Sequence, residues 1–256
     1  MRKRDNIMNN KKIREFAELT SEQVLTAVEG KTLIWPIGGI EQHGPHLPLN
    51  VDSVIPEAFA RVLAEDINGF TLPVQPVSAR SLPQSGGGLE FPGTVYLDGS
   101  TFTAYISRTI KSLCSLPFKQ LVIINGHFEN EGFIFEAVDA LRAEGHFNDR
   151  SVIVFSWWSL VSDDWTREHL VDFPGWHAEH AGLTETSLML HLRPDLVRAE
   201  RPDHDKPPRA GIYQVPIKKE FSTRGVLSKT SGSSAEIGEL IFEHVRQQIL
   251  ELVTAD

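Results

Sequence analysis

The 256-residue chain contains a single cysteine, Cys114. One cysteine excludes an intramolecular disulfide and suits a reducing compartment, so we expect the protein to be cytoplasmic. Cys114 lies within a helical pattern and has no fixed chemical partner near it in the sequence. That position favours a small buried side chain over a reactive nucleophile.

Long apolar runs and an excess of basic residues are absent as well. No stretch approaches the length needed to span a bilayer, and the basic residues 1–12 lack the apolar core of a secretory signal. The formal net charge of −9 argues against nucleic acid and against an anionic membrane surface as partners. No internal repeat or clear linker divides the chain. We therefore expect residues 1–12 to form a disordered arm and residues 13–256 to form a single domain.

Short apolar runs of strand character alternate with helical patterns along the rest of the chain. This alternation predicts an α/β fold, a three-layer αβα arrangement with a mostly parallel central sheet. Ligands of such sheets bind beyond the carboxyl ends of the strands. Residues 199–231 are rich in proline, glycine and charge, and we expect them to form a long surface excursion. The expected strands cover residues 32–37, 70–74, 119–124 and 151–155, and the expected helices cover residues 20–27, 53–66, 99–115, 133–143, 181–192 and 235–252.

A first polar cluster follows the apolar run 32–37. Glu41 and His43 are two residues apart, so their side chains point the same way in an extended backbone, and Asp52 follows after a turn rich in glycine and proline. Carboxylate and imidazole groups together suit a divalent ion such as zinc or manganese. Two alternatives remain open: a polar loop whose histidines are satisfied by hydrogen bonds, and Asp52 as only the N-cap of the next helix.

A second cluster, His127 and Glu129, follows the run 119–124 with the same spacing. Together the two clusters contain five possible ligands, too many for one tetrahedral ion. Five ligands with one bridging carboxylate would suit two ions about 3.5–4 Å apart. Such a pair can hold a bridging water whose pKa is lowered toward about 7. This arrangement favours hydrolysis.

A third cluster, residues 175–187, contains His177, His180 and Glu185. An imidazole near a metal-activated water is the usual proton carrier for an amide leaving group. Glu185 either orients that histidine or is a charge on the helix surface. The glycines of residues 85–88 indicate a backbone that bends sharply or admits a ligand closely, and no phosphate-loop signature follows them.

Three blocks of the chain, residues 41–52, 125–130 and 180–187, resemble the creatininase (creatinine amidohydrolase) family and occur in the family's order. The resemblance runs from about residue 30 to the C-terminus. Further blocks look closer to creatininase proper than to the wider family, namely residues 85–88, 91–94, 97–99 and 128–130.

The resemblance implies a homo-oligomer, often a hexamer, that acts on a small-molecule amide. It implies two divalent metal ions, Zn and/or Mn, with Asp52 as the bridging carboxylate. His180 matches the histidine that moves protons during ring opening, and Glu185 is a second catalytic candidate. The implied metal ligands are Glu41, His43, Asp52, His127 and Glu129, and the implied substrate residues are Ser85, Phe128, Trp158, Trp176 and His177.

Two residues depart from creatininase proper. A tyrosine is usual where this chain has Phe128, and an aspartate is usual where it has His177. A hydroxyl and a negative charge are thus missing from the expected pocket, and such losses can outweigh similar shape. The indoles of Trp158 and Trp176 are expected to stack on a flat, partly cationic substrate, or else to serve only as core packing.

The reaction that we expect first is hydrolysis of creatinine to creatine, by attack of a metal-bridging hydroxide and proton delivery from His180. One alternative keeps this chemistry but acts on another small cyclic amide, a lactam or a formamide, and Phe128 and His177 support it. Another alternative is a metal-dependent ligand-binding protein without turnover. We expect His46 to be a structural residue and not a ligand.

Overall fold

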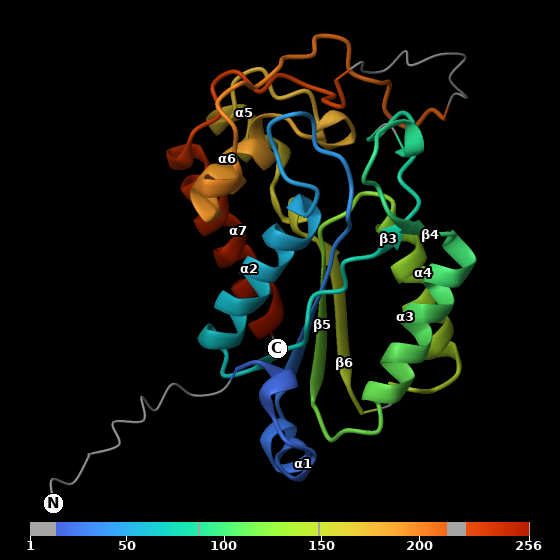
Figure 1. Cartoon of the computed structure of the whole chain (residues 1–256). Coiled ribbons are helices and arrows are strands. Elements are labelled where there is room, and N and C mark those ends of the chain that lie inside the picture. The colour runs from blue at the N-terminus through green and yellow to red at the C-terminus, as the bar shows by residue number, and fades with distance from the viewer. Residues whose placement is uncertain (1–13, 87, 148, 214–223, 256) are drawn as a thin grey trace, which may run out of the picture.

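A parallel sheet of four strands crosses the centre of the molecule (Figure 1). The computed structural model describes residues 14–86, 88–147, 149–213 and 224–255. Its strands are β1 Thr32–Ile37, β2 Phe70–Thr71, β3 Ser78–Ala79, β4 Tyr96–Leu97, β5 Gln120–Asn125 and β6 Ser151–Ser156. The order of the main sheet is β2-β1-β5-β6, and every neighbouring pair is parallel. Strands β3 and β4 form a second, short parallel pair.

Helices cover both faces of the main sheet (Figure 1). The α-helices are α1 Ser21–Val28, α2 Val51–Asp66, α3 Gly99–Leu113, α4 Asn130–Ala143, α5 Asp163–His169, α6 Leu183–Leu192 and α7 Ala235–Thr254. Short 3-10 helices are η1 Phe16–Glu18, η2 Gly88–Glu90, η3 Trp157–Leu160, η4 Trp176–Ala178 and η5 Pro194–Leu196. Helices α2, α6 and α7 pack on one face and α3 and α4 on the other, which confirms the predicted αβα fold. Within the described ranges, no helix is long and apolar enough to cross a membrane.

Successive residues of the central strands point to opposite faces of the sheet. Ile34 and Val122 lie in the hydrophobic core under α2 and α7, whereas Leu33 and Leu121 lie in the core under α3 and α4. All four side chains are fully buried. Burial on both faces explains why these strands are almost continuous apolar runs in the sequence.

Asp52 is not the N-cap of its helix. Helix α2 begins at Val51 and its N-cap is Asn50, so Asp52 lies within the first turn. A carboxylate in this position is favoured by the positive end of the helix dipole. The alternative in which Asp52 serves only as an N-cap is therefore wrong.

The segment expected to be a surface excursion returns to the core at its end. Residues 214–223 lie outside the described residues, as does the arm expected over residues 1–12. Leu227 donates its backbone N–H to the carbonyl oxygen of His180. The expectation is therefore wrong for the end of the segment, where the buried residues are Val226, Leu227, Ser228 and Thr230.

Cys114 is partly buried and packs against the core on the α3 side of the sheet. Burial raises the pKa of its thiol above the ordinary value. A thiol of this kind is a poor nucleophile at neutral pH, in agreement with the predicted packing role.

Candidate metal centre and pocket

The carboxyl ends of β1 and β5 lie side by side at one edge of the sheet. In the register of this pair, Ile37 is opposite Asn125. The segment that carries Glu41 and His43 leaves β1, and the turn that carries His127 leaves β5. The first two polar clusters therefore meet at the edge where a parallel sheet places its ligands.

Asp52 lies between two histidines. Its Oδ1 atom is 3.0 Å from Nε2 of His43, and its Oδ2 atom is 3.0 Å from Nδ1 of His127. Glu41 approaches the same Nδ1 atom, with its Oε2 atom 3.1 Å away. All four side chains are buried. One carboxylate thus reaches two separate imidazoles with a different oxygen for each.

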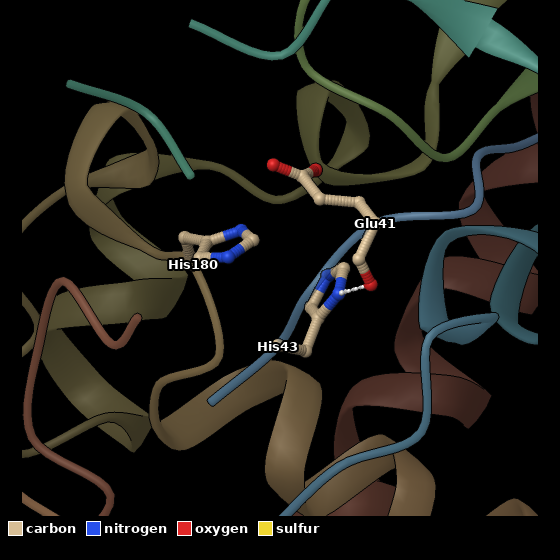
Figure 2. A group of neighbouring side chains, drawn as sticks. All are labelled: Glu41, His43 and His180. Carbon is tan, nitrogen blue, oxygen red and sulfur yellow. Dashed lines mark hydrogen bonds between the residues drawn. The ribbon is translucent and has the colours of Figure 1, made fainter. Parts of the chain in front are cut away.

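The cluster has buried polar atoms that a metal ion would satisfy. Nε2 of His43 has no hydrogen-bond partner among the described residues. His127 presents Nδ1 to Asp52 and Nε2 to Glu129. Nδ1 of His43 lies 3.1 Å from the carbonyl oxygen of Glu41 and donates to it, which leaves Nε2 of the neutral ring as the free donor to a metal (Figure 2). The donor set fits a divalent ion such as zinc or manganese. Three groups have donor atoms within 4.8 Å of one another: Glu41, Asp52 and His127; His43, Asp52 and Glu185; Glu41, His43 and His180.

Burial and neighbouring charges oppose each other in this cluster. Burial alone would lower the pKa of His43, but Asp52 and Glu185 hold it well above the ordinary value. Carboxylates likewise outweigh burial at His127, whose pKa is also raised well above its ordinary value. The pKa of Asp52 is lowered in spite of burial, because both imidazoles are close. A metal ion binds neutral imidazoles, so its binding here must displace protons.

Glu129 lies at the other nitrogen of the His127 ring. Its Oε2 atom is 3.2 Å from Nε2 of His127, whereas Asp52 faces Nδ1. Its Oε1 atom accepts the Leu82 N–H at 2.8 Å and the hydroxyl of Ser85. Among the described residues, Glu129 belongs to none of the three close donor groups.

Glu185 is buried and is not a charge on the helix surface, so that alternative is wrong. Its Oε2 atom is 3.6 Å from Nε2 of His43 and accepts the Ala181 N–H at 2.6 Å. Ala181 directly follows His180. Glu185 therefore holds the main chain beside His180 and faces the ring of His43.

The ring of His180 lies against the ring of His43, with centroids 4.4 Å apart and planes tilted by 37° (Figure 2). Its Nε2 atom is 2.9 Å from the carbonyl oxygen of Gln42. Burial, and then the charge of His43, lower the pKa of His180 well below its ordinary value. A neutral imidazole is the form that accepts a proton, as a general base must.

His46 does not join the cluster. Its Nε2 atom is 2.9 Å from Oγ1 of Thr186, which links the first polar segment to helix α6. Burial lowers the pKa of His46 to about 4. The contact is that of a structural residue, as the sequence predicts.

A pocket opens onto the cluster. Phe128 is half-exposed and stacks on Trp158, with ring centroids 6.3 Å apart. Trp157, which the sequence does not single out, contacts Trp158 and Trp176 edge-on, at 5.7 and 5.4 Å between centroids. Trp158 and Trp176 also pack against the hydrophobic core, so each combines packing with pocket lining. The pocket wall includes all five residues expected to bind substrate: Ser85, Phe128, Trp158, Trp176 and His177.

Three further polar residues belong to the site without a prediction from the sequence. Ser81 donates its hydroxyl to Glu41. Glu179 lines the pocket and accepts the N–H and the hydroxyl of Thr184 at 2.6 and 2.8 Å, and burial raises its pKa to about 7. Gln42 contacts the ring of His180. Gln42 and Glu179 lie inside segments that already held candidate residues, whereas no pattern marks Ser81.

This fold and this donor set define a metal-dependent hydrolase. The chain belongs to the creatininase family, amidohydrolases that act on C–N bonds. The family model described as "Creatininase: Creatinine amidohydrolase" matches residues 17–253. The predicted family resemblance is confirmed.

Two curated relatives show the range of the family. The chain is 38% identical over 228 residues to creatinine amidohydrolase of Pseudomonas putida, a match that covers 86% of this chain and 88% of the relative. It is 32% identical over 192 residues to a mycofactocin precursor peptide peptidase of Mycobacterium tuberculosis, covering 73% of this chain and 68% of the relative.

Solved structures agree with this assignment. A crystal structure of creatininase matches with a TM-score of 0.87 and 38% identity, covering 94% of this chain and 97% of that one. Structures described as a manganese form and as the Zn–Zn type of a mutant match with the same TM-score and 37% identity, each again covering 94% of this chain.

Proposed function

We propose that this enzyme hydrolyses a small cyclic amide, and that creatinine, opened to creatine, is the first substrate to test. The observation that carries the proposal is an aromatic-walled pocket directly above the carboxylate–imidazole cluster. The indole and phenyl faces of its wall favour a planar, partly cationic group. The Pseudomonas relative supports creatinine as the first candidate.

We further propose that two divalent ions, zinc or manganese, occupy the cluster. The position of Asp52 between His43 and His127 supports a shared carboxylate. When bound, the ions would lower the pKa of a water molecule and polarise the amide carbonyl. The proposed ligands are Glu41, His43, Asp52, His127 and Glu129, with Glu185 as a further donor beside His43.

The protein side chains then have distinct tasks. The stacked rings of Phe128 and Trp158 hold the substrate plane and limit the access of bulk water. His180, kept neutral by burial, takes a proton from the attacking water and returns it to the departing nitrogen. Glu185 keeps the backbone beside His180 in place through the N–H of Ala181.

A second candidate substrate is another cyclic amide, a lactam or a formamide. Phe128 brings no hydroxyl to the pocket and His177 brings no carboxylate, although both residues line it. The peptide peptidase relative supports a family site that accepts more than one amide. A binding protein without turnover would lack a metal donor or a proton carrier, and the described residues supply both.

The decisive experiment is an assay of purified, metal-replete enzyme with creatinine, a small lactam, a formamide and a short peptide. His180→Ala tests the catalytic step, and His146→Ala, a histidine outside the site, is the matched control. We expect creatine formation by the wild type and the control, with a loss of about 10²–10⁴-fold in His180→Ala. Creatine formation by none of the proteins would reject creatinine, and turnover of no amide would reject the proposed reaction.

We also propose a single-domain cytoplasmic protein that assembles into a homo-oligomer, with a hexamer as the expected state. The single cysteine and the net charge of −9 support the location and the absence of nucleic-acid and membrane partners. Light scattering would test the assembly, because the mass of one chain is 28.6 kDa. A mass of one chain would contradict it.

A further inference from the structure

The amide group of Gln42 joins three segments that surround the pocket. Its nitrogen, Nε2, donates to the carbonyl oxygen of Gly86 and, at 3.0 Å, to that of Gly225. Its oxygen, Oε1, accepts the N–H of Gly44 at 2.9 Å. The side chain is buried. A side-chain amide has two N–H hydrogens, so both are already used.

The orientation of this amide is determined by its partners. A flipped amide would place Oε1 against the carbonyl oxygens of Gly86 and Gly225 and would turn its own hydrogens toward the Gly44 N–H. Buried polar groups without compatible partners cost about 1–3 kcal/mol each, so the flipped form is excluded.

Nε2 of His180 lies 2.9 Å from the backbone oxygen of Gln42 and 2.9 Å from its side-chain Nε2. The amide nitrogen has three neighbours for two hydrogens, namely the carbonyl oxygens of Gly86 and Gly225 and Nε2 of His180. Donation to the two carbonyl oxygens leaves no hydrogen for His180. If Nε2 of His180 carried no hydrogen, its lone pair would face a lone pair of the Gln42 backbone oxygen, which is unfavourable. The one arrangement that satisfies every atom has the His180 Nε2–H donating to the Gln42 backbone oxygen.

The contact between the Gly225 carbonyl and the Gln42 amide requires a glycine at position 225. Gly225 has φ of +74°, and a Cβ atom at this position would overlap the Gln42 amide. Glycine therefore serves twice here, by adopting the left-handed conformation and by letting a main-chain carbonyl reach the amide nitrogen.

We propose that Gln42 is a positioning residue: its backbone oxygen holds His180 in the Nε2–H tautomer, and its side-chain amide fixes the position of that oxygen. Nδ1 is then the atom that takes and returns the proton. The assignment of Nδ1 rests on the proposed role of His180 in hydrolysis. As the water oxygen forms its bond to the amide carbon, the water proton passes to Nδ1. As the C–N bond breaks, the same proton passes from Nδ1 to the leaving nitrogen, and Nε2–H stays on Gln42 throughout.

Neutron diffraction from deuterium-exchanged crystals of the zinc-loaded enzyme tests the tautomer directly, without any substrate. We expect deuterium on Nε2 of His180, none on Nδ1, and both amide deuterons of Gln42 directed at Gly86 and Gly225. Deuterium on Nδ1 with a bare Nε2 would overturn the proposal. This result does not depend on which amide is hydrolysed, so the tautomer of His180 can be determined even if the proposed reaction is wrong.

Gln42→Met tests the positioning role, because methionine keeps the length of the side chain and removes all amide hydrogen bonds. Gln247→Met, at an exposed glutamine of α7 that bonds to Glu251, is the matched control. Gln42→Met retains the backbone oxygen that faces His180 but removes the hydrogen bonds to Gly44, Gly86 and Gly225 that fix its position. We therefore expect kcat to fall about 10–100-fold, with KM and zinc content close to wild type and with deuterium still on Nε2 of His180.

An unchanged kcat in Gln42→Met would overturn the positioning role. A loss of kcat that follows a loss of zinc would also overturn it, since Gln42 would then serve only the structure of the metal cluster. If Gln42→Met does not fold, the deuterium positions in the wild type decide the tautomer by themselves.

Discussion

The Oδ1 atom of Asp52 lies 3.0 Å from Nε2 of His43, and that nitrogen has no hydrogen-bond partner among the described residues. A carboxylate oxygen and an imidazole nitrogen this close together can face one ion once the ring is neutral. Asp52 also reaches His127 with its second oxygen. Removing its charge should therefore affect both halves of the cluster.

Asp52→Asn keeps the shape of the side chain and removes one negative charge between two imidazoles. We predict a loss of bound metal and a fall in activity of about 100-fold or more. Metal content by atomic emission and the amide assay measure these effects. Asp66→Asn, at the other end of the same helix, is the control and should change neither. Full metal content in Asp52→Asn would contradict the shared-ligand role.

Metal affinity should increase with pH. His43 and His127 have raised pKa values because carboxylates outweigh burial, so they remain protonated at a higher pH than free histidine. A metal ion needs both rings neutral and must displace these protons. Calorimetric titration with zinc in two buffers of different ionisation enthalpy should show proton release at pH 7. Affinity that is independent of pH would contradict this prediction.

Glu179→Gln should stabilise the protein at pH 8 and leave it nearly unchanged at pH 4. Burial raises the pKa of Glu179 from 4.5 to about 7, so the unfolded chain releases this proton first as the pH rises between these values. The wild type therefore loses stability across that window, by about 3 kcal/mol in all, and the variant does not. Urea unfolding at both pH values measures the difference, and exposed Glu251→Gln is the control. Equal stability of variant and wild type at pH 8 would contradict the prediction.

His180→Gln should separate the two nitrogens of this ring. The amide of glutamine can place an N–H near the position of Nε2 and so keep the bond to the Gln42 carbonyl oxygen. It cannot carry a proton at the position of Nδ1. We predict activity lower by about 10²–10⁴-fold with a Tm close to that of the wild type, and a lower Tm in His180→Ala. Activity retained in His180→Gln would show that no proton passes through this residue.

Phe128→Tyr adds a hydroxyl at the half-exposed edge of the pocket. One added hydrogen bond to substrate contributes about 0.5–1.5 kcal/mol, so kcat/KM for creatinine should rise about 2–10-fold if creatinine is the substrate. Phe135→Tyr, at a similarly exposed ring outside the pocket, is the control. A fall for creatinine together with a rise for another amide would favour the second candidate substrate.

Much of the fold and of the candidate cluster follows from local patterns. The strand over residues 32–37 is buried on both faces and therefore reads as an apolar run, and the same holds for the core of β5. Polar residues directly after such strands meet at one sheet edge because parallel strands end together. Glu41 and His127 could be placed in one cluster for this reason, before any contact was known.

Contacts between distant segments could not be predicted in this way. Residues 42 and 225 are 183 positions apart, and only the folded chain places the Gly225 carbonyl on the Gln42 amide. Glu185 reads from the sequence as either a surface charge or an orienting group, and its burial beside His43 is decided by how α6 packs. Ser81 carries no local signal because its partner, Glu41, is 40 residues away.

The sequence by itself determined the αβα class and the residue types of the cluster, because strand periodicity and donor spacing are local properties, and its three blocks carried the family resemblance. Only the tertiary structure decided that Asp52 lies between two imidazoles, that Glu129 and Glu185 approach different histidines, and that Gln42 offers His180 an acceptor and no donor. Hydrogen-bond direction depends on the full set of partners around an atom, and that set exists only when the chain is folded.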